Sequence, residues 1–184
     1  MLVSVMLRES LSNRRRYYSP GQYSIDPVHA HKKVMVRLET DLDDPCHPEP
    51  VTEQILLPAP FLVSTYQKPD LFAGKMHAVL FRSWRSRVKG RDWFDMVWYL
   101  GQEVPLRIEY LEKKMKQSGK LDEGASLTPD LFREHYVEVC RRVNFSRAFD
   151  DVEPFLEEED VEFVKAAFTE ERMLALVDRF RFEG

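Results

Sequence analysis

Apolar and polar residues alternate along the first part of the chain. In the segment 33–42, apolar residues occupy one side of the pattern and charged residues the other. A period of two residues is typical of a strand with one buried face. Two shorter runs, 54–57 and 61–66, predict further strands, and prolines mark the breaks around them. We therefore expect residues 1–70 to form a sheet lobe.

Later in the chain, apolar residues recur at the spacing of helices. This spacing predicts a first helix at 69–84 and a second at 92–100. The second helix is rich in aromatic residues, so much of it should be buried. Start and stop signals predict further helices at 105–118, after Thr128-Pro129, across 161–168 and after Thr169. We therefore expect residues 71–184 to form a C-terminal helical lobe, which makes the fold α+β.

The composition is that of a packed globular protein. Of the 184 residues, 43% are hydrophobic and 12% aromatic, whereas disordered chains are poor in such residues. The length suits one domain with an appended part rather than two full domains. The sequence has no run of eighteen apolar residues, and its start does not resemble a secretory signal. We therefore expect a cytoplasmic protein without a membrane partner, in which Cys46 and Cys140 are reduced thiols.

Charge is segregated along the chain, although the net charge is only −4. Segment 68–91 holds seven Lys or Arg against the single carboxylate of Asp70. Segment 150–162 holds eight carboxylates and no base. A basic segment of this density would suit contacts with phosphates, and a solvated surface would have the same composition. Both interpretations of the basic segment stay open.

Two cations and two carboxylates in this region have helical spacing. Lys75 and Arg82 lie seven residues apart, so they share one helix face and could converge on a phosphate chain. Asp92 and Asp95 lie three apart on the second helix, where they could orient Lys75 or a substrate hydroxyl. The structural alternatives are surface bases for the first pair and a helix cap for Asp92. Aromatic neighbours make Asp95 the more enclosed carboxylate, which would then need a partner.

A basic turn with aromatic residues beside it lies between these two helices. Its cations could hold RNA phosphates while Trp84 or Trp93 stacks a base; they are Arg85, Arg87, Lys89 and Arg91. The alternative is that the aromatic residues belong to the core. A separate group of possible metal ligands comprises His29, His31, Cys46 and His47. Its spacing fits no standard zinc pattern, so we do not interpret it as a metal site.

The order of these features resembles the third motif region of the AbiEii/AbiGii toxin family. A helix carrying Lys75 is followed by a basic turn and by Arg91-Asp92-Trp-Phe-Asp95, which is similar to the Arg-Asp-x-x-Asp helix of that family. The resemblance is specific because a helix, a basic turn and paired carboxylates occur in one order. Weaker similarity extends from about Val34 to the end of the chain.

The resemblance implies a nucleotidyltransferase-like toxin. Its fold would be a mixed sheet bearing metal-binding carboxylates, followed by a helical lobe, and it would bind nucleoside triphosphate with Mg²⁺ or Mn²⁺. RNA, notably tRNA, would be the acceptor, and a cognate antitoxin would be encoded beside the toxin. By resemblance, the catalytic residues would be Glu39, Lys75, Asp92 and Asp95. The nucleotide would be bound by Lys75, Arg82 and Arg91.

Two further carboxylates have both a functional and a structural interpretation. Glu39 lies on the polar face of the strand predicted at 33–42, at a place where nucleotidyltransferases carry a metal-binding carboxylate. A cross-strand ion pair is the alternative for this residue. Asp151 resembles a late motif of the family, and a helix cap is its alternative.

The chain also departs from the family pattern. Family members place a Gly-Ser turn and an Asp-x-Asp strand first, because carboxylates must hold the metals that bridge the triphosphate. Neither is found: Gly21 has no Asp-x-Asp after it, and a proline-rich loop follows Asp41, Asp43 and Asp44. The sequence therefore predicts a chain truncated relative to the family and inactive as it stands. The alternative is a non-catalytic module that binds RNA or protein. Because a sheet without its leading strands exposes edges, we also expect a homo-oligomer.

Overall fold

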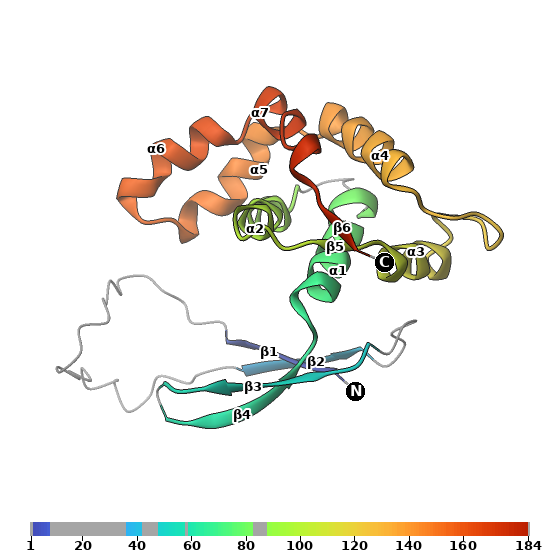
Figure 1. Cartoon of the computed structure of the whole chain (residues 1–184). Helices are drawn as coiled ribbons and strands as arrows, with labels where there is room; N and C mark the ends of the chain where they lie inside the picture. The colour runs from blue at the N-terminus through green and yellow to red at the C-terminus, as the bar shows by residue number, and fades with distance from the viewer. Residues whose placement is uncertain (1, 8–35, 42–47, 58, 83–87, 184) are drawn as a thin grey trace. The chain divides into compact units, whose positions relative to one another are not determined.

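The computed structural model describes residues 2–7, 36–41, 48–57, 59–82 and 88–183 (Figure 1). The chain divides into two compact units, 1–44 and 45–184, and each is described by itself. Some residues singled out from the sequence lie outside the described residues: Gly21, His29, His31, Asp43, Asp44, Cys46, His47, Trp84, Arg85 and Arg87.

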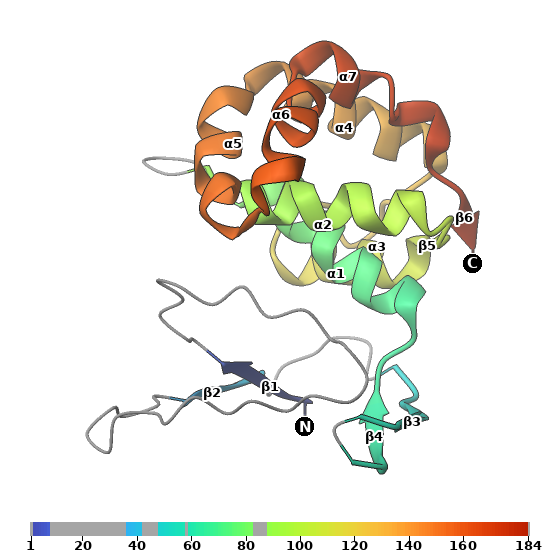
Figure 2. The same cartoon turned by 90° about the vertical axis from the view of Figure 1, so that its left-hand side faces the viewer.

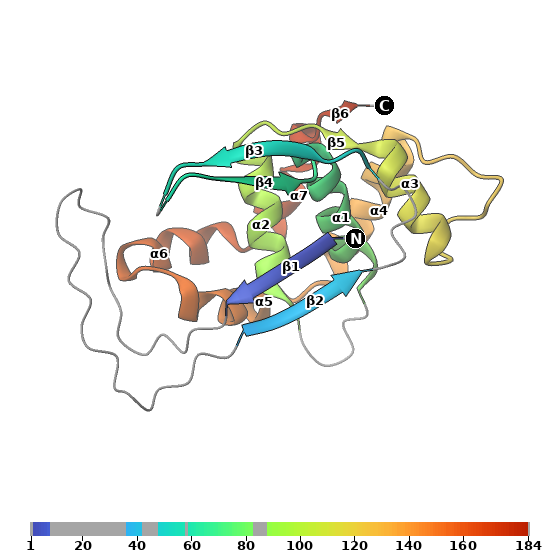
Figure 3. The ribbon, with the colours of Figure 1, turned by 90° about the horizontal axis from the view of Figure 1, so that it is seen from below.

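The first unit contains an antiparallel pair of strands. β1 (Leu2–Leu7) lies beside β2 (Val36–Asp41), with Val5 opposite Leu38 (Figure 3). The strand predicted at 33–42 is thus confirmed as β2. The sequence pattern did not predict β1, because its apolar residues do not alternate strictly with polar ones and a period of two gives little signal there.

The second unit begins with a β-hairpin. β3 (Val51–Ile55) pairs antiparallel with β4 (Phe61–Thr65), so both short strands expected in this region are present. The first one starts earlier than the pattern indicates and ends at Ile55. Large apolar side chains are exposed at the end of the hairpin where its strands join: Ile55, Leu56, Leu57, Phe61 and Leu62.

Helix α1 (Lys68–Phe81) packs against both α2 (Gly90–Gly101) and α3 (Ile108–Gln117). Pro69 lies in the first turn of α1, where the missing N–H removes no hydrogen bond. The three predicted helices are confirmed, with boundaries that differ by a few residues. Gly119 follows α3 with φ of 66°, the left-handed conformation that lets glycine end a helix.

The later helices form a second layer over one side of α1 and α2 (Figure 2). They are α4 (Pro129–Arg142), α5 (Phe145–Val152), α6 (Glu158–Ala167) and α7 (Glu170–Leu174), with 3₁₀ turns η1 (Glu153–Phe155) and η2 (Val177–Arg179). Thr128, Asn144 and Thr169 cap α4, α5 and α7, because each side-chain oxygen accepts a hydrogen bond from the backbone N–H three residues later. The sequence analysis did not predict α5, although Asn144 was a signal for its start.

Large aromatic side chains fill the space between the two layers. Phe72, Trp93, Phe132 and Tyr136 come from three helices, and all are 0% exposed. The hydroxyl of Tyr136 donates a hydrogen bond to the carbonyl oxygen of Met173 at 2.7 Å, which joins α4 to α7. Burial of such side chains contributes about 1.5–3 kcal/mol each, so this aromatic core holds the layers together.

Ion pairs of Arg107 connect the start of α1 to the C-terminal end of the chain. β5 (Leu106–Arg107) pairs in parallel with β6 (Phe182–Glu183) next to the start of α3. The Arg107 guanidinium donates to both oxygens of Asp70, at 2.9 and 3.0 Å, and to Oε1 of Glu183 at 2.6 Å. Asp70 is 1% exposed, so Arg107 links a buried carboxylate in the first turn of α1 to a carboxylate of the C-terminal strand.

The α+β fold class is confirmed. The described strands form three separate two-stranded sheets rather than the single mixed sheet that was expected. The proposed lobe boundary at residue 70 stays a prediction. In the described part of the chain, no helix has both the length and the apolar character needed to cross a membrane.

Candidate functional site

The candidate site is centred on Lys75, in the middle of α1. Lys75 Nζ donates hydrogen bonds to Oδ1 of Asp92 at 2.9 Å and to Oδ2 of Asp95 at 2.8 Å. The spacing of the two carboxylates places both on the side of α2 that meets α1. The structure therefore brings together three residues that the sequence pattern had linked only by spacing.

Arg82, directly after α1, adds a second cation. Its Nε lies 3.5 Å from Oδ2 of Asp92, so this carboxylate faces Lys75 with one oxygen and Arg82 with the other. We call Lys75, Arg82, Asp92 and Asp95 the ionic cluster. The cluster is formally neutral, because two cations face two carboxylates.

The two carboxylates of the cluster differ in exposure. The side chain of Asp92 is 9% exposed, whereas that of Asp95 is 47% exposed. The expectation that Asp95 is the more enclosed one is therefore wrong, because the aromatic residues next to it in sequence point to other sides of α2. A buried carboxylate is stable only when it is paired, so Asp92 depends on Lys75 and Arg82.

Asp92 does not cap α2, as one interpretation of the sequence proposed. The N-cap residue is Lys89, and no side chain caps this helix end. Asp92 is the third residue of α2, where a carboxylate still complements the partial positive charge of the helix N-terminus. Its side chain is therefore available for the cations of α1.

A glycine allows α2 to approach α5 closely. A Cβ atom built on Gly90 would lie 1.7 Å from the carbonyl oxygen of Ala148, far inside van der Waals contact. Because the obstacle is backbone, rotation of a side chain could not relieve the clash. Gly90 precedes Asp92 by two residues, so this close contact helps to fix the position of the cluster.

Asp151 lies in α5, near this contact. Its Oδ2 is 3.8 Å from Nε of Arg91, and its side chain is 5% exposed. The guanidinium of Arg91 also lies 5.0 Å from the ring centroid of Phe155. Asp151 belongs to the last turn of α5, so the interpretation of this residue as a helix cap is wrong.

The ionic cluster keeps Lys75 protonated. Burial alone would lower the pKa of Lys75, but the hydrogen bonds to Asp95 and Asp92 outweigh it and raise the pKa above its usual value. Tyr99, four residues after Asp95, has a raised pKa because it is partly buried, with Lys75 and Asp95 acting in opposite directions. Lys75 is therefore an ammonium ion throughout the neutral pH range.

A protein-family comparison adds independent information. The family model described as nucleotidyl transferase AbiEii toxin, type IV TA system, matches residues 4–169. The chain belongs to this AbiEii family. Searches of curated proteins and of solved structures found no match. The family is one of nucleotidyltransferase toxins from toxin-antitoxin systems, and membership implies an antitoxin partner.

The described residues do not provide a metal site of the kind that nucleotidyltransferases use with nucleoside triphosphate. They contain no group of three or more His, Cys, Asp and Glu side chains that could hold a metal ion. Asp92 and Asp95 already accept hydrogen bonds from an ammonium ion, whose charge would repel a divalent cation at the same oxygens. The ionic cluster therefore does not fit a metal ion in this arrangement.

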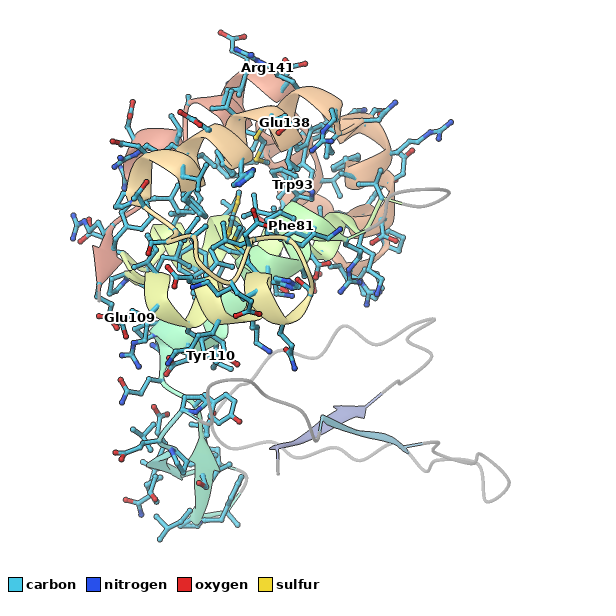
Figure 4. The ribbon with its side chains drawn as sticks, turned by 90° about the vertical axis from the view of Figure 1, so that its right-hand side faces the viewer. Phe81, Trp93, Glu109, Tyr110, Glu138 and Arg141 are labelled. Carbon is cyan, nitrogen blue, oxygen red and sulfur yellow. The ribbon has the colours of Figure 1, made fainter. Side chains whose placement is uncertain are left out.

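Of the other candidate residues, Glu39 belongs to the first unit of the chain, and Lys89 and Trp93 belong to the second. Glu39 lies on β2, and the strand register places Ser4 opposite it, so the position directly across the strand pair carries no cation. Lys89 is exposed before α2. Trp93 is 0% exposed and lies inside the helical part (Figure 4), so the core interpretation holds and this ring cannot stack a base.

Sequence reasoning missed Tyr99 and Trp98 as neighbours of the site. Tyr99 lies four residues after Asp95, a spacing that places both on one face of α2 and could have indicated the contact. Trp98 was expected to be buried with the rest of this aromatic helix, but it is 48% exposed.

We expect Gly90→Ala to destabilise the fold by about 1–3 kcal/mol or more, because the added Cβ overlaps a backbone oxygen of α5. Gly74→Ala is the matched control within α1. Its Cβ would meet nothing within 4 Å, so the higher helix propensity of alanine should leave stability equal or raise it by up to about 1 kcal/mol. Urea unfolding of both variants measures the difference. Equal midpoints would contradict the close approach of α2 to α5.

Proposed function

We propose that this chain is a nucleotidyltransferase-like toxin that binds nucleoside triphosphate and transfers a nucleotide to RNA such as tRNA. The observation that carries the proposal is the ammonium of Lys75, which is buried enough to be oriented and is still 25% exposed at its side chain. Lysine has three N–H donors, and two of them point to Asp92 and Asp95. The third donor is available for a phosphate oxygen.

The residues of the ionic cluster take different roles in this proposal. Lys75 and Arg82, with Arg91, bind the phosphates of the nucleotide. Asp95, the more exposed carboxylate, accepts the proton of the acceptor hydroxyl. At the same time, the hydroxyl oxygen of the acceptor bonds to the α-phosphorus, and the bond between this phosphorus and the leaving pyrophosphate breaks. Asp92 is a positioning residue, because it is buried and contacts Lys75 and Arg82. The basic turn binds RNA phosphates through Arg85, Arg87 and Lys89.

The first test is phosphate binding. Lys75→Ala should weaken the affinity for ATP and for tRNA about tenfold or more at low salt, because it removes a charge-assisted hydrogen bond. The tRNA affinity of the variant should also depend less steeply on salt concentration. Calorimetry and filter binding measure both effects.

Two controls accompany this variant. Lys116→Ala removes a lysine of α3 that is paired with Glu112 at 2.8 Å, and it should leave both affinities unchanged. Lys75→Gln preserves a hydrogen-bond donor to the carboxylates without the charge, and thermal unfolding reports whether the fold survives. Equal binding by the parent and by folded Lys75 variants would show that Lys75 is only a structural ion-pair partner.

A second candidate function is a non-catalytic module that binds RNA or protein. One observation favours it: both carboxylates of the ionic cluster are bound by cations, and the described residues offer no metal site. Glu39 is the one metal ligand that the sequence indicated. Under the transferase proposal, we therefore expect this chain to be slow or inactive by itself.

We expect little transfer of label from nucleoside triphosphates to total tRNA when the pure chain is incubated with Mg²⁺ or Mn²⁺. The Asp-x-Asp carboxylates of the family pattern are not found in this sequence. Catalysis of phosphoryl transfer depends on such preorganised electrostatic groups, and loss of a single one commonly lowers the rate about a hundred- to a thousandfold. Asp95→Ala is the specificity control for any incorporation. Robust incorporation that disappears in this variant would contradict the expected inactivity and would exclude the non-catalytic alternative.

We also propose that the chain forms a homo-oligomer. The exposed apolar end of the β3–β4 hairpin supports this, because soluble monomers seldom leave such a patch uncovered. Light scattering should give a dimer at micromolar concentration, and Leu62→Lys should shift it toward monomer. Phe163→Lys, at a position 76% exposed on α6, should have no effect. A mass of 21.8 kDa at every concentration of the parent would contradict the proposal.

A further inference from the structure

Two aromatic side chains are exposed on α2 beside the ionic cluster. Trp98 is 48% exposed and Phe94 is 36% exposed, although most aromatic residues of the helical part are buried. The two residues lie four positions apart, so they share one face of the helix, and Asp95 lies next to Phe94 in sequence. An exposed tryptophan near a candidate site is typical of a surface that binds a ligand.

The neighbours of Trp98 hold its ring in place. The ring of Tyr99 meets it at a centroid distance of 5.0 Å and an interplanar angle of 81°, and Tyr99 itself stacks on buried Phe72 at 4.9 Å. Tyr99 also lies within electrostatic reach of Lys75 and Asp95. Trp98 is therefore an exposed ring supported by Tyr99, which is itself stacked on the core.

A row of cations runs along α1 to the residue directly after it. Lys68, Lys75 and Arg82 are spaced seven residues apart, which is about 10 Å along a helix. The Nζ of Lys68 lies 6.0 Å from the ring centroid of Trp98, and Lys75 reaches Asp95. At one end of the row, Lys68 thus lies beside the ring of Trp98. In the middle of the row is Lys75, which is proposed to bind phosphate.

We propose that Trp98, with Lys68 beside it, stacks an unpaired nucleobase whose phosphate contacts Lys75. This inference rests on the proposed function and names the residue that binds the base. A flat exposed ring beside a cation fits a nucleotide unit, which joins a π-face to phosphate charge. Trp98 is a binding residue in this arrangement, and it binds any base because every base has a π-face.

Charge distinguishes this surface from the surroundings of Phe163, another exposed aromatic residue. Phe163 is 76% exposed on α6, but the first turn of that helix carries Glu158, Glu159 and Asp160. These carboxylates would repel a phosphate chain. Phe163 therefore provides a control position that has an exposed ring without a suitable electrostatic environment.

The test compares ligands with and without bases, using the full chain. A short single-stranded oligoadenylate is paired with an abasic ribose-phosphate oligomer of the same length, and ATP is paired with inorganic triphosphate. Trp98→Ala should lower the affinity for at least one base-bearing probe about 5- to 150-fold and leave both base-free probes unchanged. Trp98→Phe should retain most of the affinity, and Phe163→Ala should retain all of it. A loss confined to oligoadenylate assigns the stacked base to RNA, and a loss confined to ATP assigns it to the nucleotide.

Several outcomes would overturn the inference. Trp98→Ala could bind base-bearing probes as the parent does, could lose base-free probes equally, or could change only the oligomeric state, which would make Trp98 a protein contact. If Lys75→Ala weakens all probes while Trp98→Ala weakens none, the proposed function survives and the stacking surface does not. If the parent binds none of the four probes, both proposals are wrong.

Discussion

The ion pairing of a buried carboxylate sets the geometry on which the candidate site depends. Asp92 is 6% exposed, and removing a carboxylate from water is unfavourable unless cations compensate it. Those cations, Lys75 and Arg82, both belong to the α1 segment, so the pairing fixes how α1 and α2 align along their lengths. The positions of Asp95 and Trp98 then follow from helical spacing.

Packing elsewhere in the chain supports this pairing from both ends. At the start of α2, Gly90 permits backbone contact with α5, which leaves little freedom for the helix to move sideways. At the start of α1, Asp70 is bound by Arg107, which also holds the C-terminal strand. The two helices that supply the cluster are thus fixed at the ends where a small displacement would separate their charges.

Local pattern predicted the elements of the fold better than the environment of the site. Periods of two and of 3.6 residues identified β2, β4, α1 and α2, because each of these elements has a regular apolar face. The spacing of Lys75, Asp92 and Asp95 likewise indicated a shared face. Burial followed from sequence only in part. Trp93 is buried, as its core interpretation predicted, but Asp92 rather than Asp95 is enclosed, and Trp98 is exposed. These differences arise where α4 and α5 cover α2, and such contacts between distant segments leave no periodic signal.

Because the two carboxylates differ in exposure, we expect them to differ in how easily each can release Lys75. Asp92 could leave Lys75 only by losing a charge-assisted hydrogen bond in a poorly solvated position, so this contact should persist. Asp95 is half exposed, so water can replace its ion pair with Lys75 with little loss of free energy. A phosphate bound at the third donor of the ammonium could therefore weaken the pairing with Asp95 without disturbing Asp92. In the proposed transferase, Asp95 would then be free to accept a hydrogen bond from the acceptor hydroxyl.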